Sequence, residues 1–181
     1  MKRMRVILII GSSLILLAAF YALISRVRSK TVIDSWETSN NAFSILVTAY
    51  NEKSSLQLLS GAYYKFQSSI KGSTKWNEVM VFRHDDIVPV PKSQIRFVSN
   101  QVGYIFMGWM YAVTTDGGNS WSVWNAENDL PNWECCNYKL IKDISLSSTG
   151  IGMMTLSPIS GRRGEVPVLH TKDYGRHWGM E

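Results

Sequence analysis

The pattern of hydrophobic and polar positions changes abruptly near residue 30. Residues 6–24 read VILIIGSSLILLAAFYALI, which is 19 residues without a charged side chain. A helix needs about 20 apolar residues to cross the hydrocarbon core of a bilayer. The residues after Ala19 make a poor cleavage site, so the run is more typical of an uncleaved signal anchor than of a cleaved signal peptide. We therefore expect a membrane anchor at residues 1–30 and a separate domain at residues 31–181.

From Val32 onward, short runs of β-branched and aromatic residues alternate with clusters of Asn, Gly, Ser, Asp and Pro. This alternation is typical of strands separated by turns, and the domain has no long helical period. The strand-like runs are residues 42–50, 78–82, 95–99 and 103–113, and the proline-containing residues 85–94 predict an extended connector. The pattern predicts an all-β domain.

One eight-residue pattern occurs twice in this domain. Residues 114–121 read TTDGGNSW and residues 171–178 read TKDYGRHW, and both fit S/T-x-D-x-G-x-x-W. The agreement extends upstream, because residues 94–103 align with residues 143–152 without a gap. The sequence therefore contains an internal repeat.

A decayed third copy of the pattern begins at Ser69 and ends at Trp76. Lys71 stands where the other copies have Asp, and Ser73 stands where they have Gly. The three tryptophans lie 45 and 57 residues apart, within or near the period of a propeller-like blade. We expect about three repeat units.

The pattern resembles the Asp box of sialidase-like propellers, BNR-repeat proteins and photosystem assembly and stability factors. The residues that carry the resemblance are Thr114, Asp116, Gly118 and Trp121 in one copy, and Thr171, Asp173, Gly175 and Trp178 in the other. The resemblance implies β-propeller-like repeats in which the box is a structural turn away from any active site.

Three units are too few for a normal propeller ring, which has about 4–8 blades. Three alternatives remain: the chain oligomerises, it forms a small open β-meander or sandwich, or it is a truncated descendant of a longer propeller. Few residues follow Trp178, so we expect the last outer strand to be short or to be completed by another segment such as Val32–Trp36.

The residue types of the box suit a tight turn. An Asp carboxylate accepts hydrogen bonds from backbone N–H groups two or three residues on, and a Ser or Thr hydroxyl ties the other leg of the turn. A glycine two positions after the Asp tolerates a positive φ, and a Trp that folds back buries about 150–250 Å². We interpret Asp116 and Asp173 as turn formers and not as catalytic acids.

The positive charge of the chain belongs to the anchor region. Residues 1–30 contain six basic and no acidic residues, which leaves 13 basic and 14 acidic residues for the domain. Without a basic excess the domain is a poor candidate for binding nucleic acid. Three basic residues lie on each side of residues 6–24, so the positive-inside rule decides little. The free amine at the N-terminus and the tail of only five residues before the span favour placing residues 31–181 outside the cytoplasm.

Metal, cofactor and redox chemistry find little support in the sequence. Cys135 and Cys136 are adjacent, and a disulfide between neighbours is strained, so we interpret them as reduced thiols. The histidines, His84, His170 and His177, lack the spacing of a metal site. We predict no metal and no cofactor.

Two polar segments are weak candidates for a binding site. One is the cluster Arg83, His84, Asp85 and Asp86, and the other is the loop that contains Arg162 and Arg163. The alternative is that both segments are solvated loops without a ligand.

We predict a non-catalytic, membrane-anchored module that binds or assembles another protein or a glycan. The alternative is a sialidase-like glycoside hydrolase whose site is completed by oligomerisation. That alternative requires arginines to converge on one pocket; the candidates are Arg83, Arg96, Arg162, Arg163 and Arg176.

Overall fold

The computed structural model describes residues 29–53, 61–84, 92–126, 139–158 and 168–180. In these ranges the chain is all-β, as predicted, and forms three antiparallel sheets, none of which closes on itself. No helix within the same ranges is both long and apolar enough to span a bilayer. The expected span at residues 6–24 lies outside the described residues and stays a prediction.

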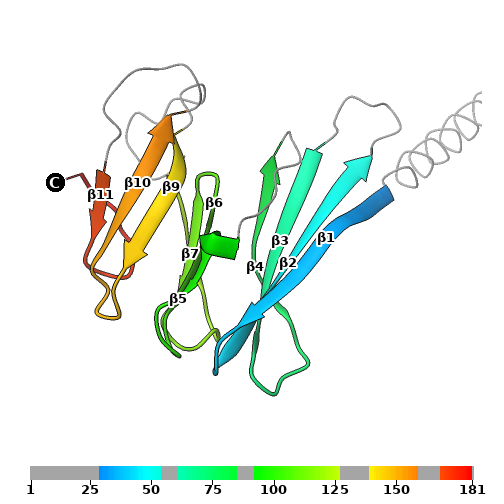
Figure 1. Ribbon diagram of the computed structural model, residues 1–181, viewed down its shortest axis with the longest axis horizontal. Coiled ribbons are helices and arrows are strands. Elements are labelled where there is room, and N and C mark those ends of the chain that lie inside the picture. The colour runs from blue at the N-terminus through cyan, green and yellow to red at the C-terminus, as the bar shows by residue number, and fades with distance from the viewer. Residues whose placement is uncertain (1–28, 54–60, 85–91, 127–138, 159–167, 181) are drawn as a thin grey trace, which may run out of the picture.

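Each sheet is built from strands that follow one another in the chain (Figure 1). The first sheet contains β1 (Ser29–Ser39), β2 (Phe43–Lys53), β3 (Gly61–Ile70) and β4 (Asn77–His84). A 3₁₀ turn, η1 (Lys92–Gln94), leads into the second sheet, which contains β5 (Ile95–Phe97), β6 (Gly103–Met107), β7 (Met110–Thr114) and β8 (Ser122–Asn125). The third contains β9 (Lys139–Leu146), β10 (Gly152–Pro158) and β11 (Val168–Thr171).

The second sheet lies between the other two and is buried on both faces (Figure 1). Along β6, Tyr104 and Phe106 pack in the core shared with the third sheet, whereas Ile105 and Met107 pack in the core shared with the first. Successive side chains of a strand point to opposite faces, so a strand with two covered faces is apolar throughout. This explains the unbroken apolar run at residues 103–113.

That run is a hairpin and not the single strand that the pattern suggested. Met107 pairs with Met110, so Gly108 and Trp109 form a two-residue loop. Gly108 has a φ of 59°, and a glycine with positive φ at the first central position suits a type II′ turn. The phenyl ring of Phe82 lies where a β-carbon of residue 108 would be, so this glycine also admits a close contact with the first sheet.

The first sheet has one apolar and one mixed face. Phe43, Ile45 and Val47 of β2 are buried against the second sheet. The outward face carries polar groups, including the ion pair between Lys65 and Glu78 with a separation of 3.4 Å. Terminal units of repeat arrays also present a polar outer face. The outward face of this sheet is therefore exposed and mixed, with polar groups beside exposed valines such as Val32 and Val81.

Of the two alternatives for the last outer strand, completion by Val32–Trp36 is wrong, and a short strand is what the structure shows. Residues 32–36 belong to β1, where Val32 pairs with Tyr50 and Trp36 pairs with Val47 of β2. The third sheet is instead extended by its own chain, because Gly179 and His170 exchange two backbone hydrogen bonds of 2.8 and 3.0 Å.

Candidate functional site

The repeated pattern occupies the same place in the topology of each sheet. Residues 115–121 join the third strand of the second sheet, β7, to its fourth strand, β8. Residues 172–178 follow β11, the third strand of the third sheet, and the decayed copy joins β3 to β4. The repeat seen in the sequence is thus a repeat of sheet architecture.

In the first turn, Thr114 and Asp116 hold the backbone together. The Thr114 hydroxyl donates to Asp116 Oδ1 at 2.8 Å and accepts the N–H of Gly118 at 2.9 Å. Asp116 Oδ1 also accepts the N–H of Ser120 at 2.9 Å, and Asp116 Oδ2 accepts the Ser120 hydroxyl at 2.5 Å. Both carboxylate oxygens are therefore used within the turn.

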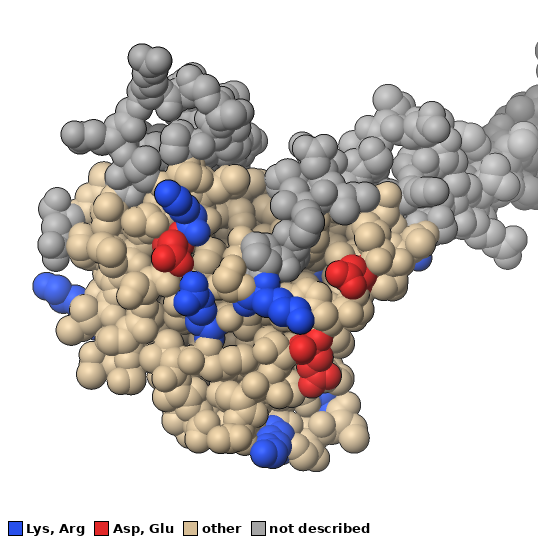
Figure 2. Space-filling view, in the orientation of Figure 1, with Lys and Arg blue, Asp and Glu red and all other residues tan. Residues whose placement is uncertain are grey.

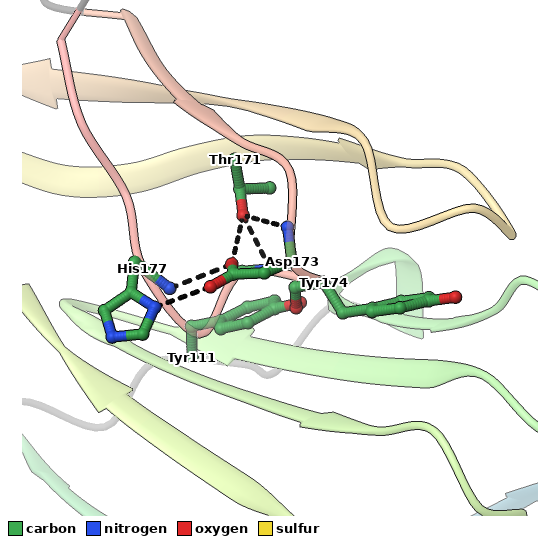
Figure 3. Close-up of polar contacts among 6 residues, drawn as sticks. Tyr111, Thr171, Asp173, Tyr174 and His177 are labelled. Atoms are coloured by element: carbon green, nitrogen blue, oxygen red, sulfur yellow. Dashed lines mark hydrogen bonds and ion pairs between the residues drawn. The ribbon is translucent and has the colours of Figure 1, made fainter.

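The second turn repeats this arrangement with a histidine in place of the serine (Figure 3). Thr171 donates to Asp173 Oδ1 at 2.8 Å and accepts the N–H of Gly175 at 2.9 Å. Asp173 Oδ1 accepts the backbone N–H of His177 at 3.1 Å, and Asp173 Oδ2 lies 2.5 Å from His177 Nδ1. Each carboxylate thus accepts the backbone N–H of the residue four positions on, one position beyond the two or three expected.

Positive φ angles occur at two positions in each turn. Gly118 and Gly175, the glycines of the pattern, have φ of 86° and 77°. The preceding residues, Gly117 and Tyr174, also have positive φ, at 71° and 65°. Tyr174 is strained in this region, where a β-carbon is unfavourable, and the pattern gave no sign of it. Its backbone N–H is held by the carbonyl of Gly150 at 2.9 Å.

The gapless upstream alignment has a structural counterpart. Gly117 N–H donates to the carbonyl of Gln101 at 2.9 Å, just as Tyr174 N–H donates to Gly150. Gln101 and Gly150 are aligned residues, so the same hydrogen bond ties the turn to the first hairpin loop of its sheet in both units.

Each turn docks on the sheet that precedes it in the chain. The Trp121 ring packs edge-on against Phe43 of β2, with ring centroids 6.0 Å apart, and Trp121 Nε1 donates to Ser68 Oγ of β3 at 2.9 Å. Trp178 packs against Tyr111 of β7 at 5.6 Å and against Trp124 of β8 at 6.3 Å. The turns therefore connect neighbouring sheets.

The decayed copy makes a different turn. Gly72 has a φ of 84°, but Ser73 replaces the second glycine and lacks a positive φ. The Ser69 hydroxyl donates to the carbonyl of Ser73 at 3.2 Å, whereas the threonines of the other turns accept an N–H. Trp76 is half-buried and belongs to neither core cluster.

The environment of each turn keeps its carboxylate ionised. Partial burial raises the pKa of Asp116, but the hydrogen bonds from Ser120, Thr114 and Asn119 outweigh it and hold the pKa below its ordinary value. For Asp173, partial burial again raises the pKa, and the hydrogen bonds from His177 and Thr171 lower it to about 2. An acid that donates a proton near neutral pH needs a raised pKa, so neither residue suits that role.

An open cavity of about 440 Å³ lies beside the second turn. It is lined by His170, Thr171, Lys172, Asp173, His177, Trp178, Gly179 and Met180. The polar side-chain groups of Thr171 and Asp173 are engaged in the turn. The side chains of His177 and Lys172, which also line the cavity, are exposed. No cluster of metal-ligating side chains occurs in the described part of the chain.

The weak binding candidates are only partly visible. Arg83 is exposed on β4, and its guanidinium carbon lies 5.7 Å from the ring centroid of Tyr63. His84 ends β4, but its side chain is not described. The remaining candidates, Asp85, Asp86, Arg162 and Arg163, lie outside the described residues, as do Cys135 and Cys136.

The described arginines of the domain do not share a pocket. Arg83 contacts Tyr63, Arg96 pairs with Asp143 at 3.6 Å, and Arg176 donates to Thr115 at 3.4 Å. None of the three lines the cavity beside the second turn. On the face seen in Figure 2, charged side chains of both signs are scattered over the surface.

A row of four side chains crosses the outward face of the first sheet, one from each strand. Lys30 Nζ of β1 lies 5.0 Å from the ring centroid of Tyr50 on β2. Tyr50 stacks on Tyr63 of β3, with centroids 5.2 Å apart and ring planes 4° apart. Arg83 of β4 then lies over Tyr63. We call this row the cation–tyrosine ladder. Sequence reasoning missed it because only strand register brings the four residues together.

No protein-family model, curated protein or solved structure matches this chain.

Proposed function

We propose that the protein is a membrane-anchored, non-catalytic binding or assembly module. Residues 6–24 anchor it, and the three sheets form an Asp-box, propeller-like repeat scaffold outside the cytoplasm. The observation that carries this proposal is the use of Asp116 and Asp173 within their own turns. Glycoside hydrolysis needs two carboxyl groups on either side of one bond, and these two are committed to structure.

The internal architecture also supports a scaffold. Two turns with matching backbone hydrogen bonds each connect a sheet to its predecessor, through Trp121 and through Trp178. Such joints hold the sheets rigid while the loops between them are free to differ. Rigid elements that position variable loops are a common basis for recognition.

The partner is identified by crosslinking in native membranes with the full chain. A photoreactive residue is placed at Val81, Val123 or Met153, which are 40%, 46% and 43% exposed and lie on the first, second and third sheets, respectively. We expect one position to crosslink a discrete membrane-associated species that the other two do not reach. Absence of a discrete product at all three positions would argue against a binding module.

The same preparation tests the hydrolase alternative. The full chain is incubated with a fluorogenic sialoside and with other fluorogenic glycosides, and the D116N and D173N variants serve as controls for the turn residues. Turnover that exceeds the background and is lost on mutation of an acidic residue would replace the proposal with an enzymatic function.

A further inference from the structure

We propose that the cation–tyrosine ladder docks on anionic phospholipid headgroups of the membrane that holds residues 6–24. The inference rests on the proposed membrane anchor. It assigns a role to Lys30, Tyr50, Tyr63 and Arg83, which neither the core nor the repeated turns use.

The ladder faces away from the rest of the domain. Ala62 and Tyr64, the neighbours of Tyr63 on β3, are buried in the core shared with the second sheet. Alternation along the strand therefore points Tyr63 outward. Tyr50 and Tyr63 are half-buried, and Lys30 and Arg83 are exposed. The ladder thus presents two tyrosine rings flanked by two cations on an accessible face.

The ladder lies at the end of the sheet where the chain comes from the predicted span. β1 begins at Ser29, and Lys30 is six residues beyond Ile24. A chain extends at most about 3.3–3.6 Å per residue, so Lys30 lies within about 20 Å of the end of that span. Tyr50 and Tyr63 are direct cross-strand partners near that end of the sheet, because β2 ends there and β3 begins there.

Its chemistry matches the interfacial layer of a membrane. Tyrosine is enriched at the membrane–water interface, where its ring meets apolar chains and its hydroxyl meets water. Lysine and arginine near an anionic leaflet each strengthen binding by on the order of five-fold. Arg26 and Arg28 in the linker have the same charge. Farther along the outward face, Lys65 is paired with Glu78, whereas Lys30 and Arg83 at the end near the anchor lie over tyrosine rings.

One acidic residue is in register with the ladder. Glu52 of β2 is the cross-strand partner of Lys30. A negative charge at this register position opposes docking on an anionic surface, so the substitution Glu52→Gln should strengthen the contact. Stronger membrane contact in the Glu52→Gln variant cannot come from a purely structural role of Lys30 and Arg83.

The test uses the full chain in vesicles of phosphatidylcholine alone or with phosphatidylglycerol. Hydroxyl-radical footprinting measures the oxidation rates of Tyr50 and Tyr63, with exposed Met153 of the third sheet as the internal reference. We expect both tyrosines to react at least three-fold more slowly in the anionic vesicles, and high salt to abolish the difference.

Matched variants separate the ladder from general charge. The K30Q/R83Q variant should lose the protection and E52Q should increase it. The K71Q/K75Q variant removes two cations from the turn at the opposite end of the same sheet and should leave the protection unchanged. Equal tyrosine rates in the two kinds of vesicle, or protection that survives K30Q/R83Q, would overturn the proposal. If K30Q/R83Q fails to fold, the proposal is judged by how the oxidation rates of Tyr50 and Tyr63 depend on lipid and salt in the native chain and in E52Q.

Failure of the anchor gives a different result. The full chain should float with neutral vesicles if residues 6–24 insert. If it does not float, the anchor proposal is wrong, and the tyrosine rates with anionic vesicles still judge the docking of the ladder.

Discussion

Trp121 Nε1 donates a hydrogen bond to Ser68 Oγ at 2.9 Å, and the equivalent bond is missing one sheet further on. Ser68 immediately precedes Ser69 of the decayed copy, and the residue in the same position before Thr114 is Val113. The side chain of Val113 has no acceptor, and the buried Nε1 of Trp178 has no hydrogen-bond partner. The two turns therefore pack on the preceding sheet in a similar way, but the indole N–H of Trp121 has a hydrogen-bond acceptor and that of Trp178 does not.

Supplying or removing the acceptor should change stability in opposite directions. Ser68→Ala should lower the free energy of unfolding by about 1–2 kcal/mol, because Trp121 N–H and the carbonyl of Gly118 both lose a partner. Val113→Thr should cost about 1 kcal/mol less than Val47→Thr, a substitution at an equally buried valine without an orphan N–H nearby. Urea denaturation measures all three, and equal costs for the two valine changes would contradict the account.

The two tryptophans should respond differently to loss of the indole N–H. Trp121→Phe removes a hydrogen bond and should cost about 1 kcal/mol beyond the loss of ring volume. Trp178→Phe removes an unpartnered buried donor, so the volume loss is offset. Chemical denaturation of both variants should show the larger loss for Trp121→Phe, although Trp178 is the more buried of the two. The reverse order would show that ring packing outweighs the hydrogen bond.

Gly118 is required both by its backbone conformation and by close packing, whereas Gly72 is required by its backbone conformation alone. Both have positive φ, at 86° and 84°, but a β-carbon at Gly118 would lie 2.8 Å from the Phe43 ring, whereas nothing lies within 4 Å at Gly72. Gly72→Ala should cost about 1–2 kcal/mol from backbone strain alone. Gly118→Ala should cost about 1–3 kcal/mol more from overpacking. Thermal unfolding with calorimetry compares them, and similar losses would mean that Phe43 moves aside freely.

Stability should fall in acid through Asp173. Its pKa in the folded protein is about 2, against an ordinary value of 3.8. A lowered folded-state pKa stabilises the protein fully above the unfolded value, and the stabilisation is lost as the pH falls from about 4 to about 2. The melting temperature of the native chain should therefore decline more steeply over this window than that of D173N. Parallel curves would show that the carboxylate contributes no pH-dependent stability; at 39% side-chain exposure we expect a modest effect.

Much of the fold follows from local patterns. β2 and β4 match the apolar runs at residues 42–50 and 78–82 because alternation and turn residues act over short distances. The hairpin at Gly108 was missed for the opposite reason. Burial on both faces made β6 and β7 apolar throughout, so the run contained no alternation to mark its turn.

By itself, the sequence determined the all-β class, the repeated unit and the residues of its turns. Each of these depends on groups within about eight residues of one another, such as the Thr, Asp and Gly of a single turn. Only the tertiary structure decided that the turns dock on the preceding sheet. It also decided that Ser68 accepts a hydrogen bond from Trp121, whereas the side chain of Val113 offers Trp178 no acceptor. The same holds for the placement of Lys30 and Arg83 on either side of two stacked tyrosines. The physical reason is strand register, because a shift of one residue turns every side chain of a strand to the opposite face.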